Sequence, residues 1–151
     1  MKLAEALAER SDCQVRIEEL KKRMVRSARI QEGEPPAEDA NELLAETDRL
    51  FVRLEELISA INRTNARTMF DETRTISDAI GARDLTAKKR DLLAGLAEAA
   101  STRQDRYSKS EIKFVATVSI VGLQKSVDQL SKRYRELDTK LQELNWRTEI
   151  V

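Results

Sequence analysis

The stretch IVGLQKSVDQLSKRYRELDTKLQEL, residues 120–144, decides the fold of this chain. Its apolar residues recur at alternating steps of three and four, which is the spacing of one face of an α-helix. They are Ile120, Leu123, Val127, Leu130, Tyr134, Leu137, Leu141 and Leu144. Because burial of a large apolar side chain stabilises a fold by about 1.5–3 kcal/mol, this stretch predicts a helix that packs against a partner.

Three other segments carry the same periodicity. The first face comprises Leu3, Ala6, Cys13, Ile17, Leu20, Met24 and Ser27, with Arg10 as a polar exception. The second comprises Leu43, Thr47, Leu50, Leu54, Leu57 and Ile61, flanked by Leu44, Phe51 and Ile58. The third segment, roughly Ile76 to Arg103, is the weakest, and its better half contains Leu85, Leu92, Leu93, Leu96 and Ala99.

Start signals precede two of these segments. Asp39 followed by Glu42, and Thr75 with Asp78, have the side chains that cap helix N-termini. Long helices joined by short connections pack as antiparallel neighbours, and the seams match the repeat of a coiled coil. We therefore predict a mainly α fold, an antiparallel four-helix coiled-coil-like bundle in one domain over residues 1–151.

The segment IKFVATVSIV, residues 112–121, differs from the rest. Its apolar residues alternate, and β-branched residues are frequent, which favours a strand. We expect a short β-strand or hairpin element around residues 68–76 and 112–119. A helical start over Ile112–Val121 is the alternative, because tertiary context overrides such propensities.

The charges are balanced, with 27 Lys+Arg and 27 Asp+Glu in a sequence that is 36% charged. Such balance is typical of solvated helix faces with ion pairs, and four acid–base pairs have the favourable i, i+4 order. They are Glu18 with Lys22, Glu19 with Arg23, Asp84 with Lys88, and Glu136 with Lys140. Zero net charge argues against nucleic-acid binding through Arg63, Arg67, Arg74 and the Lys88–Arg90 run.

The residue content also argues against an enzyme. The sequence has 0 His, which removes the usual general base and the common nucleophile pairs. No glycine-rich phosphate loop is present, and the single Cys13 lies on the apolar face of the first segment. We expect no catalytic residues, no cofactor and no metal.

The location follows from what the chain lacks. The start MKLAEALAER has no apolar core of a secretion signal, and no run approaches the roughly 18 apolar residues of a membrane helix. We expect a cytoplasmic protein without membrane contact. The third segment is too poor a partner to close a bundle, so we also expect a homo-oligomer, in which another copy covers the remaining apolar surface.

Three polar clusters are candidate interaction sites. The first is Asn62, Arg63, Thr64 and Asn65, where a continued helix would carry amides into the seam and fix its register; the alternative is a helix C-cap. The second is Asn145 and Trp146, which with Gln142 would satisfy those amides, or form a terminal hydrophobic plug. The third is the loop with Arg106, Tyr107, Ser108 and Glu111, a partner-binding surface or a capped turn.

The segments INRTN, QDRYSKSEIKFVATV and LDTKLQELNW, with IQEGEPPAED, resemble a family of small bacterial helical proteins named septicolysin. The resemblance implies a mostly helical, cytosolic-looking protein without catalytic residues, and the name implies a cytolysin. The residues that match its shared segments are Asn62, Arg63, Thr64, Asn65, Arg106, Tyr107, Ser108, Glu111, Asn145 and Trp146.

Two functions follow from the sequence. The first is a non-catalytic, oligomeric, helical structural or interaction protein that binds itself and an unidentified protein partner. The alternative is a septicolysin-like, membrane-active protein, for which a pore-forming strand pair is hard to find because only residues 112–121 have that pattern.

Overall fold

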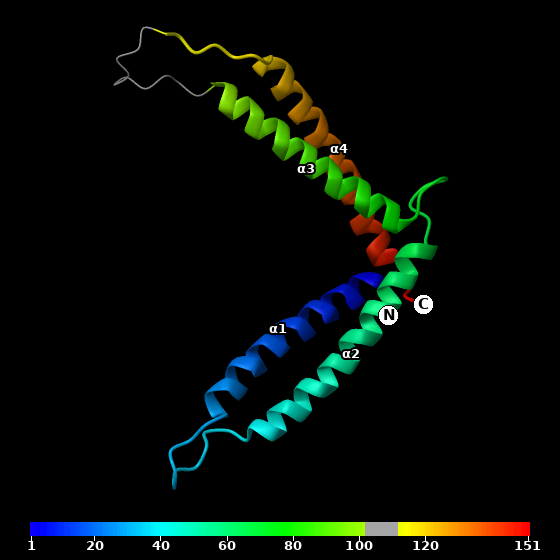
Figure 1. Cartoon of the computed structure of the whole chain (residues 1–151). Helices are drawn as coiled ribbons and strands as arrows, with labels where there is room; N and C mark the ends of the chain where they lie inside the picture. The colour runs from blue at the N-terminus through cyan, green and yellow to red at the C-terminus, as the bar shows by residue number, and fades with distance from the viewer. Residues whose placement is uncertain (102–111) are drawn as a thin grey trace. The chain divides into compact units, whose positions relative to one another are not determined.

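The computed structural model describes residues 1–101 and 112–151 and contains four helices (Figure 1). They are α1 (Leu3–Ser27), α2 (Ala40–Arg67), α3 (Ile76–Ser101) and α4 (Ile120–Arg147). The predicted mainly α class and the four predicted helices are confirmed. The α-helix continues through Asn62–Asn65 and ends at Arg67, so the C-cap alternative for these asparagines is wrong.

The chain divides into two compact units. Unit 1 comprises Met1–Thr68 and Glu143–Val151, and unit 2 comprises Met69–Gln142. The single domain over residues 1–151 stays a prediction.

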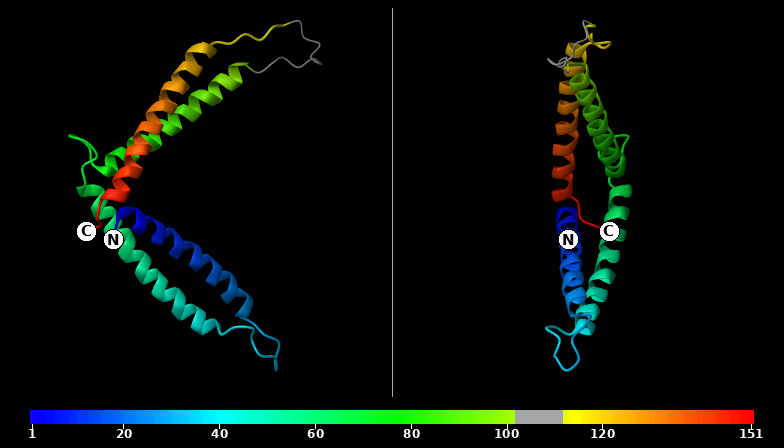
Figure 2. Two further views of the ribbon diagram at one scale, coloured as in Figure 1. Left: turned by 180° about the vertical axis from the view of Figure 1, so that it is seen from behind. Right: turned by 60° about the vertical axis from the view of Figure 1, so that its left-hand side comes forward.

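In unit 1, α1 and α2 run antiparallel, side by side, in both views of Figure 2. Their shared face is that of the predicted seams, because the periodic apolar residues can leave water only where the helices meet. The buried residues of α1 are Leu3, Ala6, Cys13 and Leu20, and those of α2 are Leu43, Thr47, Leu57, Ile61 and Thr64. Cys13 is therefore a buried small side chain of this core.

Both predicted start signals cap helices. The Asp39 carboxylate accepts a hydrogen bond from the Asn41 amide at 2.8 Å. At α3, the Thr75 amide donates to Asp78 Oδ2 at 2.8 Å, and the Asp78 amide donates to Thr75 Oγ1 at 3.2 Å. The bonds from Thr75 hold the pKa of Asp78 below its ordinary value, since they stabilise the ionised carboxylate.

In unit 2, α3 and α4 form a second antiparallel pair (Figure 2). Arg83 of α3 bonds Asp138 of α4 at 2.9 Å, and the Arg90 guanidinium lies 5.3 Å from the centre of the Tyr134 ring. The large buried side chains gather at the end of the pair where α3 begins. They are Phe70, Ile76, Leu137 and Leu141.

The buried face of α3 is not the predicted one. It comprises Ile76, Ala79, Thr86 and Ala97, whereas Leu85 and Leu92 are each 66% exposed and Leu96 is 42% exposed. Most of the buried residues are small, and small side chains let the two helix axes approach closely. Leu85, Leu92 and Leu96 therefore remain on a face that α4 does not cover, whereas Leu93 is half-buried.

The predicted strand element is also wrong. Residues 112–119 form no strand, and Phe114 is 79% exposed. Around residues 68–76 the structure has a turn with one isolated bridge between Met69 and Thr75. Lys140 lies 4.5 Å from the Phe70 ring, twenty residues along α4 from Ile120, a separation of about 30 Å. The two segments are thus too far apart to pair, and the helical alternative fails too because α4 begins only at Ile120.

Candidate functional site

Two ion pairs connect α1 to α2, and a third connects α1 to the segment just before α2. Glu9 Oε1 lies 2.7 Å from Arg53 Nε, Glu46 Oε1 lies 2.9 Å from Arg16 Nη2, and Glu38 Oε2 lies 3.0 Å from Arg23 Nε. The α1 partners are seven residues apart, and the partner number falls as the α1 number rises. This set therefore pins the antiparallel register of the pair, because a shift of one turn would separate all three.

The sequence predicted ion pairs within helices, at i, i+4 spacing, rather than these pairs. None of the four i, i+4 pairs forms in the described residues. Arg23 binds Glu38 instead of Glu19, while Glu19 lies 3.8 Å from Arg16. Arg16 binds Glu46 of α2, and Arg23 binds Glu38 just before α2, so both reach carboxylates outside their own helix.

The ion pairs perturb their own titration. The hydrogen bond from Arg53 lowers the pKa of Glu9, and the hydrogen bond from Arg23 lowers the pKa of Glu38. In return, the bond to Glu9 raises the pKa of Arg53. These carboxylates remain ionised and paired, so they lack the raised pKa that a general acid at neutral pH requires.

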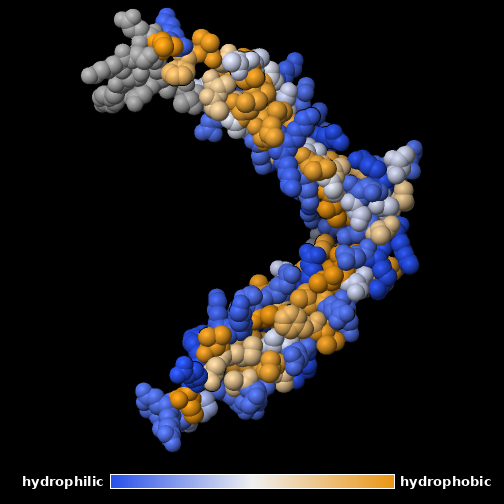
Figure 3. Space-filling model, in the orientation of Figure 1, coloured by the Kyte–Doolittle hydropathy of each residue, from blue (hydrophilic) through white to orange (hydrophobic). Residues whose placement is uncertain are grey.

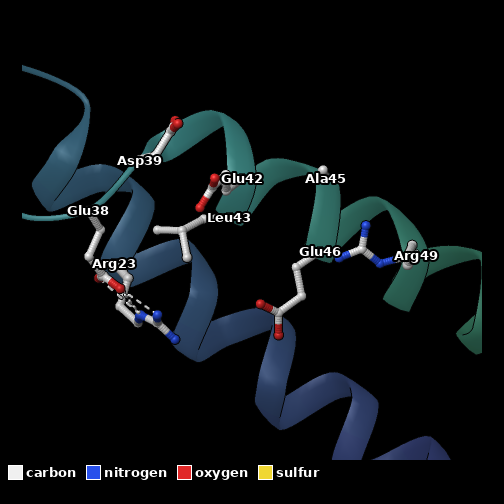
Figure 4. Close-up of a pocket in the computed structure, with 8 residues that line it drawn as sticks. All are labelled: Arg23, Glu38, Asp39, Glu42, Leu43, Ala45, Glu46 and Arg49. Carbon is white, nitrogen blue, oxygen red and sulfur yellow. Dashed lines mark hydrogen bonds and ion pairs between the residues drawn. The ribbon is translucent and has the colours of Figure 1, made fainter.

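A shallow depression lies where α1 ends and α2 begins (Figure 4). Its lining is mostly charged and comprises Arg23, Glu38, Asp39, Glu42, Leu43, Ala45, Glu46 and Arg49. Glu38 and Glu46 are held by arginines of α1, and Asp39 caps α2. Within residues 1–101 and 112–151, no cluster of three or more acidic or sulfur ligands could hold a metal ion. The depression thus presents fixed charges to solvent.

The end of α2 binds the last residues of the chain. Thr64 is 1% exposed; its hydroxyl donates to the Ala60 carbonyl at 2.8 Å and accepts from the Val151 amide at 3.0 Å. Arg63 Nη2 donates to the main-chain oxygen of Val151 at 3.1 Å. The predicted polar cluster therefore holds a main-chain segment, with Thr64 rather than an asparagine in the seam.

The same segment also binds the start of α1. The Leu3 amide donates to the Thr148 carbonyl at 2.8 Å, and the Ile150 amide donates to the Met1 carbonyl at 3.1 Å. Lys2 Nζ lies 2.6 Å from Glu149 Oε1, and this contact lowers the pKa of Glu149. Residues 148–151 are thereby held from both helices of unit 1.

The remaining predicted residues are dispersed. Asn62 is exposed, and Asn65 is half-buried with its Oδ1 atom out of contact with water and without a hydrogen-bond partner in the described part of the chain. Asn145 is half-buried, and Trp146 is 64% exposed and so forms no plug. Arg106, Tyr107, Ser108 and Glu111 lie outside the described residues.

A second apolar row lies on α2, on a face that α1 does not cover. Leu44, Phe51 and Ile58 are seven residues apart and are 50%, 54% and 38% exposed. We call them the α2 stripe. Hydrophobic side chains reach the surface of both helix pairs (Figure 3). The sequence already placed these three residues beside the seam, but a wide apolar face alone does not tell how much of it a neighbour covers.

Comparison with known proteins gives a family without an activity. The model described as "Family of unknown function (DUF6847)" matches residues 10–150. A solved structure of a functionally unknown conserved protein from Corynebacterium diphtheriae is 46% identical, with a TM-score of 0.94 over 100% of this chain and 99% of that one. No curated protein matches. Neither description supports the septicolysin name.

Proposed function

We propose that this chain, which belongs to the family of unknown function DUF6847, is a non-catalytic helical interaction protein that self-associates. The α2 stripe carries the proposal. Three large side chains at heptad spacing, each more than a third exposed, form the kind of seam that packs against another helix. Exposure of such a row to water is unfavourable, and a partner that covers it lowers the free energy of the assembly.

The charged groups support a binding role over catalysis. The sequence has 0 His. In the depression, Glu38 and Glu46 bind arginines of α1, and Asp39 caps α2. Groups held in this way stabilise a register. We place the protein in the cytoplasm for the reasons given by its sequence; no helix within the described residues is long and apolar enough to cross a membrane.

The mass of the protein in solution tests self-association. Multi-angle light scattering after size exclusion should give a multiple of the single-chain mass. Phe51→Glu should shift that mass towards one chain, because a carboxylate would be buried in the contact. Val25→Glu is the matched control, since Val25 is 69% exposed on α1 outside the stripe. A single-chain mass at concentrations up to roughly 100 μM would contradict the proposal.

A membrane-active role is the second candidate. The observation in its favour is the exposed apolar run before α4, in which Phe114 is 79% and Val115 is 81% exposed. A dye-release assay with liposomes of mixed neutral and anionic lipids separates the two functions. We expect no release, because the segment forms no strand that could pair within a pore. Release that Phe114→Ser abolishes would favour the membrane role.

A further inference from the structure

The exposed leucines of α3 form a second row of the same kind. Leu85 and Leu92 are seven residues apart, and Leu96 follows four residues later. At about 100° per residue, Leu92 lies about 140° around the helix from Ala97, which is buried. The α3 stripe of Leu85, Leu92 and Leu96 thus faces away from α4.

The half of unit 2 that is remote from the start of α3 has few large buried side chains. The large buried side chains of unit 2 lie near the start of α3 and the last turns of the α4 segment in this unit. Beyond them along the pair, Thr86 and Ala97 are the buried residues of α3, and the seam residues of α4 from Ile120 to Tyr134 are at most half-buried. Helices of this length gain most of their stability from packing, so the outer half of the pair gains much from a partner.

The α2 and α3 stripes share one spacing. Leu44 and Phe51 of α2, like Leu85 and Leu92 of α3, are one heptad apart, which is about 10.5 Å along a helix. Rows that share this step can interdigitate over it, as the ridges and grooves of packed helices do. Spacing alone also permits each stripe to pair with its own copy.

The charges beside the stripes distinguish these pairings. Asp48 and Glu55 flank the α2 stripe, each four residues after one of its members and three before the next. Lys89 occupies the same position on α3, four residues after Leu85 and three before Leu92, and Lys88 lies on the other side. Pairing α2 with α2 would place acid against acid, and pairing α3 with α3 would place lysine against lysine. Pairing α2 with α3 places opposite charges together.

These four charges are free to make such contacts. In residues 1–101 and 112–151, Asp48, Glu55, Lys88 and Lys89 form no ion pair, whereas Glu46 and Arg53 of α2, on the side of α1, are both paired. Asp48 and Glu55 thus lie unpaired beside the apolar row that lacks a partner. When two helices pack antiparallel, residues at equivalent positions beside the seam meet, so Glu55 and Lys89 would be neighbours.

We infer that the α2 stripe packs antiparallel against the α3 stripe of a second copy of this chain, with Phe51 opposite Leu92 and Glu55 beside Lys89. The inference rests on the proposed self-association and names the surface and the occupant. In a closed twofold dimer the contact would occur twice.

A charge-reversal cycle tests the pairing. Lys89→Glu and, separately, Glu55→Lys should each weaken self-association about 3- to 10-fold in sedimentation equilibrium, and the combined variant should recover most of the loss. Lys125→Glu, an exposed lysine of α4, is the matched control. Circular dichroism checks that each variant is folded. Losses that simply add in the combined variant would overturn the pairing.

Cysteine cross-linking locates the contact. In a Cys13→Ser background, a tagged Phe51→Cys chain mixed with an untagged Leu92→Cys chain should give a mixed disulfide, because the Cβ atoms of a disulfide lie about 3.8 Å apart. A product only from Phe51→Cys with itself would overturn the inference in favour of an α2–α2 contact. A chain carrying both substitutions that closes on itself in dilute solution would overturn it in favour of a contact within one copy.

The outcomes separate this inference from the proposed function. A wild-type protein that stays a single chain contradicts both. A protein that self-associates but shows neither charge coupling nor the mixed disulfide contradicts the pairing alone.

Discussion

Thr64 accepts a hydrogen bond from the Val151 amide at 3.0 Å, across 87 residues of sequence, while its own hydroxyl proton goes to the Ala60 carbonyl. A side chain inside the α2 seam thus satisfies a main-chain group of the last residue. Beside it, Arg63 binds the main-chain oxygen of the same residue. Arg63 and Thr64 therefore bind main-chain atoms of Val151. This role is structural, and it differs from the predicted role of asparagines that fix the register of a seam.

Replacing this hydroxyl should destabilise the protein. Thr64→Val keeps the shape but leaves the Val151 amide without its acceptor, so we expect the free energy of unfolding to fall by about 1–2 kcal/mol. Urea titration followed by circular dichroism measures it. Thr139→Val on an exposed face of α4 is the control and should change the free energy by less than about 0.5 kcal/mol. Equal effects would show that the bond to Val151 contributes nothing.

The two asparagines of α2 should respond differently to leucine. Asn65 Oδ1 is shielded from water without a hydrogen-bond partner in the described residues, so Asn65→Leu should raise the free energy of unfolding by about 1 kcal/mol. Asn62 is exposed, and Asn62→Leu should leave that free energy within about 0.5 kcal/mol of the original. Thermal and urea unfolding of the two variants measure these changes. Destabilisation by Asn65→Leu would mean that the Asn65 amide has a hydrogen-bond partner in solution.

The ion pairs between α1 and α2 should make stability depend on pH. Arg53 lowers the pKa of Glu9 below its ordinary 4.5, and Arg23 does the same to Glu38. A carboxyl group that binds protons less readily in the folded chain stabilises the fold above its unfolded pKa, and this contribution is lost as pH falls through the folded pKa. Stability should therefore be level near neutral pH and decline below about pH 4.5.

The matched variants for this prediction are Glu9→Gln and Glu38→Gln, compared with Glu136→Gln on the surface of α4. The first two should reduce stability at pH 7 and flatten its decline in acid, as measured by urea titrations from pH 7 to pH 3. Sodium chloride should weaken the same contribution, because these pairs are partly exposed. An unchanged acid profile in Glu9→Gln would refute a role for this pair.

The Phe70 ring should contribute more than its apolar area. It is buried, with the Arg74 guanidinium 5.2 Å and the Lys140 ammonium 4.5 Å from the ring centre. Phe70→Leu keeps an apolar side chain but removes both cation contacts, so we expect a loss of about 1–2 kcal/mol in the free energy of unfolding. Phe114→Leu, where the ring is 79% exposed, should have no measurable effect. A double-mutant cycle with Lys140→Met isolates the contact to the lysine.

Local features of the sequence determined where the helices lie. The apolar spacing of residues 120–144 predicted α4, and the caps Asp39 and Thr75–Asp78 mark the starts of α2 and α3 in the structure. Of the two alternatives for Asn62–Asn65, the continued helix is the one that forms, and α2 ends at Arg67. Periodicity and capping depend on residues within one or two turns, so a single sequence contains them.

The tertiary structure alone decided which side chains are buried and which partners they bind. Leu85, Leu92 and Leu96 lie on the exposed face of α3 because small residues pack against α4, and residues 112–119 have no strand to pair with. Thr64 rather than Asn62 is buried because Val151 meets α2 there, and Arg23 binds Glu38 because α1 and α2 bring them together. These outcomes depend on residues far apart in the chain, whose approach no local pattern encodes.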